Sequence, residues 1–386
     1  MKVLLATTYV IPHEGGLSTH LTQLAPGLER LGHQVRLVHG GQVRGSGLAR
    51  VLWAVPSMGN LDRYVARSMG AQLRRLGALL RKEIDGFAPD LVHCHEPFSA
   101  SAAGEVIGAR ALPLVETVHG PALYEAEMGG TMRGWRHREF ILGCERRAFA
   151  AARRIIAVDS GQAAILRNDY AVDPARIAVI FNCVNVAEVR RLAEAQSPLH
   201  PVEPYFLVPR RLVPKTGVQY AIAALTRMGD TAARLVIAGG GPLRKELESL
   251  AASLGVAERT RFLGSLSREE ALPLFPRAAA VIVPSVPASG VVEATSLAVT
   301  EAMACGTLVI ASRLGGLAEL VENGVTGLLV PPADPDALAA AMTKAMRDMP
   351  LRQRILEAAR RKVETDYDAP AWLEKTIAVY RQALTG

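Results

Sequence analysis

A chain of 386 residues with 49% apolar and 21% charged residues has the composition of an ordinary globular protein and the length of two average domains. These values exclude a disordered or fibrous chain, and no apolar run approaches the roughly 18 residues that a membrane helix needs. The net charge of +7 is a mild excess, compatible with a nucleic acid, an anionic lipid or a phosphorylated ligand.

The start of the chain and the cysteines indicate a cytoplasmic protein. The apolar stretch after Lys2 runs into His13-Glu14-Gly15-Gly16 and not into a small-residue cleavage site, which predicts a first strand and no signal peptide. The four cysteines are far apart and form no CxxC pair, so we expect buried free thiols in a reducing compartment.

Short apolar runs rich in Val and Ile alternate with amphipathic stretches along the whole chain. Near-continuous apolar strands separated by helices are typical of parallel sheets covered on both faces. The strands predicted in the first half are residues 2–8, 34–40, 90–95, 112–119, 154–159 and 177–182. Those predicted in the second half are residues 205–210, 234–239, 261–264, 280–285, 308–312 and 327–331. Two such series predict an α/β fold of two Rossmann-like, doubly wound domains that face each other across a cleft.

The stretch 63–82 combines basic residues with apolar residues at helical spacing. It predicts a helix that packs on the core and exposes a basic face. The alternative is a helix that lies on an anionic bilayer surface, and with it a peripheral position at the inner face of the membrane.

The domain boundary is predicted near residues 196–204, where three prolines exclude both a helix and an inner strand. The first domain then covers residues 1–198 and the second covers residues 199–368. A last helix, about residues 369–386, is expected to pack back onto the first domain.

Ligands of open parallel sheets bind beyond the carboxyl ends of the strands, so residues that follow strands are the candidates for the site. In the first domain, Gly15 and Gly16 follow a strand and allow a backbone to approach a ligand closely. His119 ends another strand. For all three, the alternative is an ordinary structural role in a strand-to-helix connection.

His93, His95 and Glu96 also lie at a strand end, but strand alternation places only the two histidines on one face. We assign no metal ligand there and expect no cofactor.

In the second domain, Arg211 and Lys215 follow the first strand and lead into a glycine turn. Two cations in this place suit a diphosphate whose leaving charge must be neutralised, although an exposed basic loop is the alternative. Gly240 and Gly241 follow the next strand, where glycine lets a nucleotide approach the backbone. They form no complete GxGxxG pattern.

The strongest pattern is Glu293-Ala-Thr-Ser-Leu-Ala-Val-Thr-Glu301, followed by Ala302-Met-Ala-Cys-Gly306. Thr295, Ser296 and Leu297 would begin a helix, and their backbone N–H groups would bind an anion there. Glu301 would accept hydrogen bonds from ribose hydroxyls, and Glu293 from those of a sugar beyond the phosphates. The alternative is two surface glutamates that merely favour a helix start.

Two further acidic positions follow in the chain. Asp334-Pro335-Asp336 spells the DxD triplet of metal-dependent transferases, but capping of the helix that begins at Pro335 explains it. Glu319, after Gly315-Gly316, is expected to line the same ligand site.

The run EATSLAVTEAMACGTLVIASRLGGLAELVENGVTGLLVPPAD resembles the family-four retaining glycosyltransferases, whose two glutamates are separated by seven residues. The resemblance covers nearly the whole chain and is densest in the second domain. It implies the GT-B fold, an acceptor-binding first domain and a second domain that holds most of the nucleotide-sugar donor. Where many members read E-G-F-G, this chain reads Glu293-Ala294-Thr295-Ser296.

By this resemblance, Glu301 binds the ribose of the donor, Glu293 and His119 contact the transferred sugar, and Gly15 and Gly16 lie beside the donor phosphates. Arg211 matches the arginine that neutralises the diphosphate. The lysine of the family stands where this chain has Thr216, which leaves Lys215, one position earlier, as the second cation.

We therefore expect a metal-independent hexosyltransferase that acts with retention on a UDP-sugar, with a GDP-sugar as the second option. The acceptor is a saccharide, an aminocyclitol or a lipid, and the protein is a monomer or homodimer without a nucleic-acid partner. A nucleotide-sugar epimerase, a dinucleotide-dependent oxidoreductase and a non-catalytic nucleotide-sugar-binding protein are the alternatives.

Overall fold

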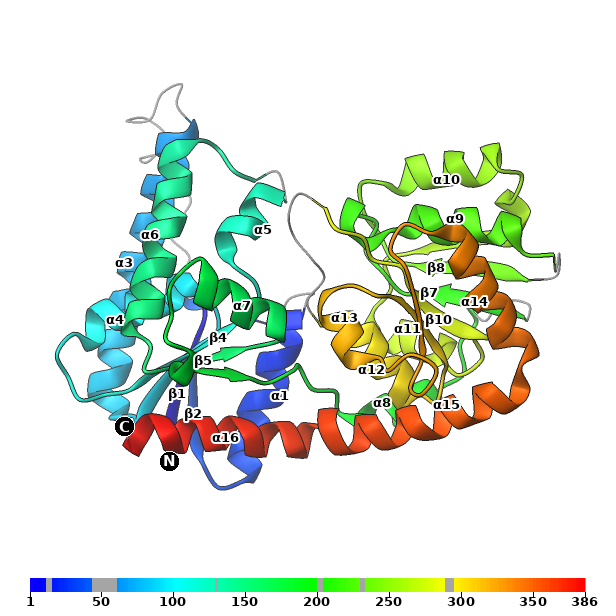
Figure 1. Ribbon diagram of the computed structural model, residues 1–386. Coiled ribbons are helices and arrows are strands. Elements are labelled where there is room, and N and C mark those ends of the chain that lie inside the picture. The colour runs from blue at the N-terminus through cyan, green and yellow to red at the C-terminus, as the bar shows by residue number, and fades with distance from the viewer. Residues whose placement is uncertain are drawn as a thin grey trace. The chain divides into compact units, whose positions relative to one another are not determined.

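The computed structural model describes residues 1–11, 16–43, 61–128, 131–199, 204–229, 233–288 and 295–385. The chain divides into two compact units. One comprises Met1–Phe181 with Trp372–Gly386, and the other comprises Asn182–Ala371. Each unit contains one six-stranded parallel sheet flanked by helices (Figure 1).

The first unit has the sheet order β2-β1-β3-β4-β5-β6. Its strands are β1 (Lys2–Ala6), β2 (Gln34–Val38), β3 (Leu91–Cys94), β4 (Leu114–Val118), β5 (Arg154–Ala157) and β6 (Ile177–Val179). Its helices are α1 (Gly16–Arg30), α3 (Leu61–Phe87), α4 (Pro97–Ile107), α5 (Ala122–Met128), α6 (Trp135–Ala151), α7 (Ser160–Asn168) and α16 (Ala369–Thr385), of which α16 begins in the last residues of the second unit. Short 3-10 turns are η1 (Gly40–Gln42) and η3 (Pro174–Arg176).

The second unit has the sheet order β12-β11-β10-β7-β8-β9. Its strands are β7 (Tyr205–Val208), β8 (Arg234–Ala238), β9 (Thr260–Gly264), β10 (Ala280–Val283), β11 (Val309–Ser312) and β12 (Leu328–Val330). Its helices are α8 (Val186–Ala193), α9 (Val218–Arg227), α10 (Arg244–Ser253), α11 (Arg268–Ala271), α12 (Leu297–Ala304), α13 (Gly315–Leu320), α14 (Pro335–Arg347) and α15 (Met349–Lys362). Its shorter turns are η4 (Pro214–Thr216), η5 (Ala257–Arg259), η6 (Leu272–Leu274) and the π-turn η7 (Val363–Tyr367).

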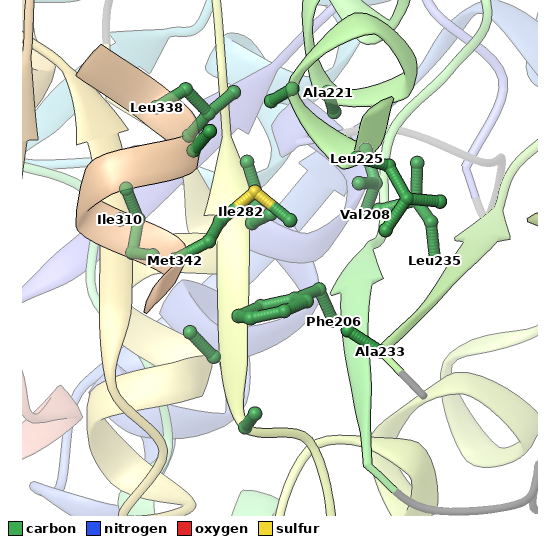
Figure 2. Packing of buried hydrophobic residues seen from close by; sticks show 14 of the residues in the cluster. Phe206, Val208, Ala221, Leu225, Ala233, Leu235, Ile282, Ile310, Leu338 and Met342 are labelled. Carbon is green, nitrogen blue, oxygen red and sulfur yellow. The ribbon is translucent and has the colours of Figure 1, made fainter. Parts of the chain in front are cut away.

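The apolar composition of the strands explains both sheets. Each predicted run overlaps one observed strand, which confirms the two doubly wound domains of the predicted fold class. Strand β9 begins at Thr260, one residue before its predicted run. In the second unit, Phe206 and Val208 of β7, Ile282 of β10 and Ile310 of β11 lie in one buried cluster (Figure 2). The helices α9 and α14 close this cluster with Leu225 and with Leu338 and Met342, and so fix one face of the sheet.

The second unit begins earlier in the sequence than the predicted boundary at residue 198. The N–H of Val184 donates to the carbonyl of Tyr367 at 2.9 Å, and α8 packs against α12. Residues 182–198 therefore belong with the second sheet.

Helix α3 is the predicted basic helix. Its Leu76, Leu80 and Ile84 are buried in the core of the first unit, as the core-packed interpretation requires. Within the described ranges, no helix is long and apolar enough to cross a membrane.

Helix α16 contributes buried side chains to the first unit. Trp372 and Tyr380 are almost fully buried, and Leu373 lies against Gly27 of α1. The hydroxyl of Tyr380 is 2.7 Å from Nδ1 of His93 on β3. This bond ties the C-terminal helix to the sheet.

Candidate functional site

In each sheet, one pair of neighbouring strands has connections that lead toward opposite edges of the sheet, and this pair marks the topological switch point. In the second unit this switch point lies between β7 and β10, and in the first unit it lies between β1 and β3. Ligands of such sheets bind outside the carboxyl ends of the strands at this place. Several predicted site residues follow these strands.

Arg210 spans the switch point of the second unit. It follows β7, and its Nη1 donates to Oγ of Ser296 at 2.7 Å, while its Nη2 donates to Oγ of Ser285 at 3.3 Å. Ser285 follows β10, and Ser296 is the N-cap residue of α12. A guanidinium is thereby held beside a helix N-terminus.

The side chain of Ser296 does not cap α12. Within the described residues its hydroxyl makes no hydrogen bond to the first turn and accepts from Arg210. The N–H of Val299 donates to the carbonyl of Ser296 at 3.0 Å. The dipole of α12 and the charge of Arg210 both favour an anion at this place.

The loop that carries Arg211 and Lys215 packs on the segment after β10. Arg211 is exposed. The carbonyl of Lys215 accepts from the N–H of Val286 at 2.9 Å. The hydroxyl of the buried Thr216 donates to the carbonyls of Arg211 and Val213, which closes the turn. Thr216 therefore has a structural role at the position of the family lysine.

Gly239 and Gly241 after β8 are explained by contact with this same loop, whereas a Cβ atom on Gly240 would lie 2.3 Å from Oγ of Ser265. A Cβ atom on Gly239 would lie 1.8 Å from the carbonyl oxygen of Arg210, and one on Gly241 would lie 2.4 Å from that of Leu212. The N–H of Leu212 also donates to the carbonyl of Gly240 at 2.9 Å. The close approach of protein backbone, without any ligand, is sufficient to require glycine here.

Glu301 lies one turn into α12 and is held by an arginine. Its Oε1 accepts from Nε of Arg268 at 2.9 Å, and Nη1 of Arg268 contacts Glu188 at 3.0 Å. Burial raises the pKa of Glu301, and the charge of Arg268 opposes that shift. The side chain keeps 15% of its surface exposed, so a hydroxyl can reach it from solvent.

The remaining predicted residues of this site lie in different places. Thr295 accepts a hydrogen bond from Asn182 at 2.9 Å, and Leu297 is the first residue of α12. Glu319 is half-buried on α13. Asp334 caps α14 by accepting from the N–H groups of Asp336 and Ala337, which confirms the capping interpretation of the DxD triplet.

Two predicted residues, Glu293 and Gly15, lie outside the described residues. Gly16 is the first residue of α1. The two glutamates of the sequence pattern are therefore represented by Glu301 alone.

The switch point of the first unit brings together histidines from three segments. His95 follows β3, His119 follows β4, and His20 comes from the first turns of α1. The ring centroid of His20 is 5.0 Å from that of His95 and 4.8 Å from that of His119. Burial lowers the pKa of His95 and His119 well below the ordinary value, and neighbouring imidazoles add to the shift. These rings are neutral at pH 7.

Sequence reasoning missed two features of these sites. Arg210 stood beside Arg211 in the motif, but the motif gave no sign that Arg210 bridges Ser285 and Ser296. His20 stood four residues after Gly16, where only the strand order shows that it meets the residues after β3 and β4.

Two protein families match consecutive parts of the chain. Residues 14–188 match the family described as Glycosyltransferase Family 4, and residues 189–362 match the family described as Glycosyl transferases group 1. Together they cover nearly the whole chain.

Individual proteins give the same result. The chain is 30% identical to the glycogen synthase of Mycobacterium tuberculosis, over 96% of this chain and 92% of that protein. The fold is similar to that of a glycosyltransferase from Rickettsia africae, with a TM-score of 0.73, 20% identity, and coverage of 100% of this chain and 99% of the other. It is also similar to that of Anabaena HepE in complex with UDP-glucose, with a TM-score of 0.72, 18% identity, and coverage of 99% and 100%.

Proposed function

Because this chain belongs to the family-4 glycosyltransferases and has the two-domain GT-B fold, we propose that it transfers a hexosyl group from a nucleoside-diphosphate sugar to an acceptor hydroxyl. The proposed donor is a UDP-sugar, with a GDP-sugar as the second choice. The acceptor is a saccharide, an aminocyclitol or a lipid. The observation that carries this proposal is the guanidinium of Arg210 at the N-terminus of α12, with Arg211 next to it in the chain.

These groups suit the charge that develops during transfer. The bond between the anomeric carbon and the β-phosphate oxygen breaks, and its electron pair stays on the leaving diphosphate. Arg210, Arg211, Lys215 and the N–H groups of α12 stabilise the added negative charge in place of a metal ion. The proposed transfer is therefore metal-independent.

The acceptor hydroxyl forms the new bond on the face from which the diphosphate leaves, so the anomeric configuration is retained. Its proton passes to the departing phosphate. The products are a nucleoside diphosphate and a glycoside, and no protein nucleophile takes part. Retention is proposed from the resemblance to the family-four retaining glycosyltransferases.

Donor recognition is assigned to side chains around the diphosphate. Glu301, whose direction is fixed by Arg268, accepts hydrogen bonds from the ribose hydroxyls. Glu293 and His119 contact the transferred sugar. The choice of a UDP-sugar rests on Anabaena HepE, whose structure contains UDP-glucose. The similarity to a glycogen synthase supports glucose as the hexose.

The first experiment is a thermal-shift screen of UDP, GDP and ADP, followed by a transfer assay. We expect UDP to raise the melting temperature most, because a ligand stabilises the folded state that binds it. Arg210→Ala and Arg211→Ala should each lower kcat/KM by about 100-fold or more, as loss of one charge-stabilising donor does. Glu301→Ala should also lower kcat/KM, because it removes the acceptor for the ribose hydroxyls of the donor.

Arg277→Ala is the matched control, because Arg277 is exposed and precedes β10, at the amino end of that strand and not at the carboxyl end where the site lies. Its transfer rate should equal that of the wild type. Wild-type turnover in Arg211→Ala or Glu301→Ala would overturn the site. Conversion of the donor to its epimer without an acceptor would overturn the reaction itself.

A further inference from the structure

The three histidines at the switch point of the first unit form a compact group. Each of His20, His95 and His119 offers one ring nitrogen, and these three atoms lie within 4.8 Å of one another. The group draws on α1 and on the ends of two adjacent strands, β3 and β4. Its geometry is therefore set by the sheet.

Ring nitrogens of His95 and His119 make no hydrogen bond to the described residues. Among the described residues, neither ring nitrogen of His95 has a hydrogen-bond partner, and Nε2 of His119 has none. His95 is fully buried, where a polar atom without a partner is costly. These nitrogens are therefore available to coordinate a ligand.

The neighbouring polar side chains are already committed elsewhere. His93 contacts Tyr380 at 2.7 Å and Thr117 at 2.8 Å, so both of its nitrogens are used. Glu96 caps α4 and accepts from the N–H of Thr8. Of the three residues that the sequence placed at this strand end, His93 and Glu96 are thus excluded as ligands. His95 remains, and His20 and His119 complete the group.

We propose that His20, His95 and His119 form a three-histidine site for a late first-row divalent metal ion, with Zn²⁺ as its representative. Neutral imidazole is the preferred nitrogen ligand of such ions, whereas Mg²⁺ takes oxygen ligands. Zn–N bonds of about 2.0–2.1 Å in a tetrahedron place the nitrogens about 3.3 Å apart. The three nitrogens now lie within 4.8 Å of one another, so they would draw together by up to about 1.5 Å when the ion binds.

The fourth position of the ion is left to water or to a ligand. His119 is only partly buried, so the ion can reach the group from its side.

Metal binding has a consequence that rests on the proposed function. His119 is assigned to the transferred sugar, and a bound ion would occupy its free nitrogen. Zn²⁺ should therefore lower the rate of transfer, and EDTA should restore it. The ion is an inhibitor in this scheme and is separate from the diphosphate chemistry.

The test measures binding without donor or acceptor, so that its outcome does not depend on transfer activity. The full chain is stripped with EDTA, desalted and titrated with Zn²⁺ by calorimetry. One ion per chain is expected, and Co²⁺ should give the visible absorption bands of tetrahedral coordination. His95→Leu should bind Zn²⁺ at least tenfold more weakly and lose the Co²⁺ bands.

Two further variants complete the design. His33→Ala should bind as the wild type does, since His33 lies near the N-terminal amine at 3.1 Å and outside the group. His119→Ala provides a second ligand deletion, should His95→Leu not fold. The absence of one tight Zn²⁺ per chain, or unchanged binding in the ligand variants, would overturn the site. So would loss of binding in His33→Ala.

Discussion

Glu116, in the middle of β4, is a buried acid with an unusual environment. Its side chain is fully buried, and neither carboxyl oxygen has a hydrogen-bond partner among the residues that the structure describes. Burial raises the pKa of Glu116 well above the ordinary value, and the carboxyl groups of Glu96 and Glu145 raise it further. The folded protein therefore holds this group protonated where the unfolded chain would ionise it.

This environment predicts a loss of stability at high pH. The contribution of Glu116 is fully present below about pH 4.3, the pKa of an unfolded glutamate, and is lost as the pH rises toward the folded pKa. Glu116→Leu removes that loss. We expect its free energy of unfolding, measured in urea, to exceed that of the wild type by about 1–3 kcal/mol at pH 8 and by less at pH 5.

Glu105→Gln is the control for this measurement. Glu105 is exposed, and its contact with Arg147 at 3.5 Å is a surface ion pair of small value. Its stability should stay near that of the wild type at both pH values. A Glu116→Leu protein that is less stable than the wild type at pH 8 would show that Glu116 has a favourable partner.

The side chains that decide the chemistry were the hardest to place from sequence. Alternation along a strand cannot tell whether Arg210 or Arg211 turns toward the helix that starts at Leu297, because both follow the last strand residue. The contact depends on β7 and β10 being neighbours, although more than 70 residues separate them in the chain. For His20, the same strand-order information was missing.

At the scale of elements, the strands could be predicted from the sequence because of where they lie in the sheets. Runs such as Tyr205–Val208 and Ala280–Val283 are apolar at every position, and a strand buried on both faces tolerates little else. The domain division was less predictable. The prolines near residue 200 suggested a boundary there, but the burial of α8 residues such as Val189 in the second unit moved it to Asn182.

Helix α16 is held on the first unit by buried apolar side chains and by polar contacts, among them the buried contact between Tyr380 and His93. Tyr380→Phe removes the hydroxyl and leaves Nδ1 of His93 without its partner. We expect a loss of about 1–3 kcal/mol in the free energy of unfolding, the usual cost of an unsatisfied buried group. Urea unfolding followed by circular dichroism measures it.

Tyr220→Phe is the matched substitution on α9, where the hydroxyl of Tyr220 makes no hydrogen bond to the described residues. It should change the stability by less than about 0.5 kcal/mol. Equal stabilities for the two phenylalanine variants would mean that the bond between Tyr380 and His93 contributes nothing.

At the scale of the whole molecule, the four cysteines are all free thiols, as expected from their spacing. Cys94, Cys144 and Cys183 are buried, while Cys305 is partly exposed. Burial raises the pKa of the Cys144 thiol to about 11, despite the opposing charge of Arg147. For Cys305, burial and Glu301 raise the pKa to about 12.

These thiols should react slowly in the native protein. Because the thiolate is the reactive form, a disulfide reagent at pH 8 should label Cys305 first and the three buried thiols only as the protein opens. In guanidinium chloride all four should react within the mixing time. Rapid labelling of several thiols in the native state, or fewer than four after denaturation, would contradict this prediction.

The glycines after β8 affect how related sequences should be interpreted. Since the carbonyls of Arg210 and Leu212 leave no room for a side chain there, any relative that keeps this loop must keep glycine, whether or not it is an active enzyme. A relative that has lost catalysis should therefore retain Gly239 and Gly241 while its equivalents of Arg210, Arg211 and Glu301 diverge. The charged positions, and not the glycines, would then distinguish working enzymes from inactive descendants.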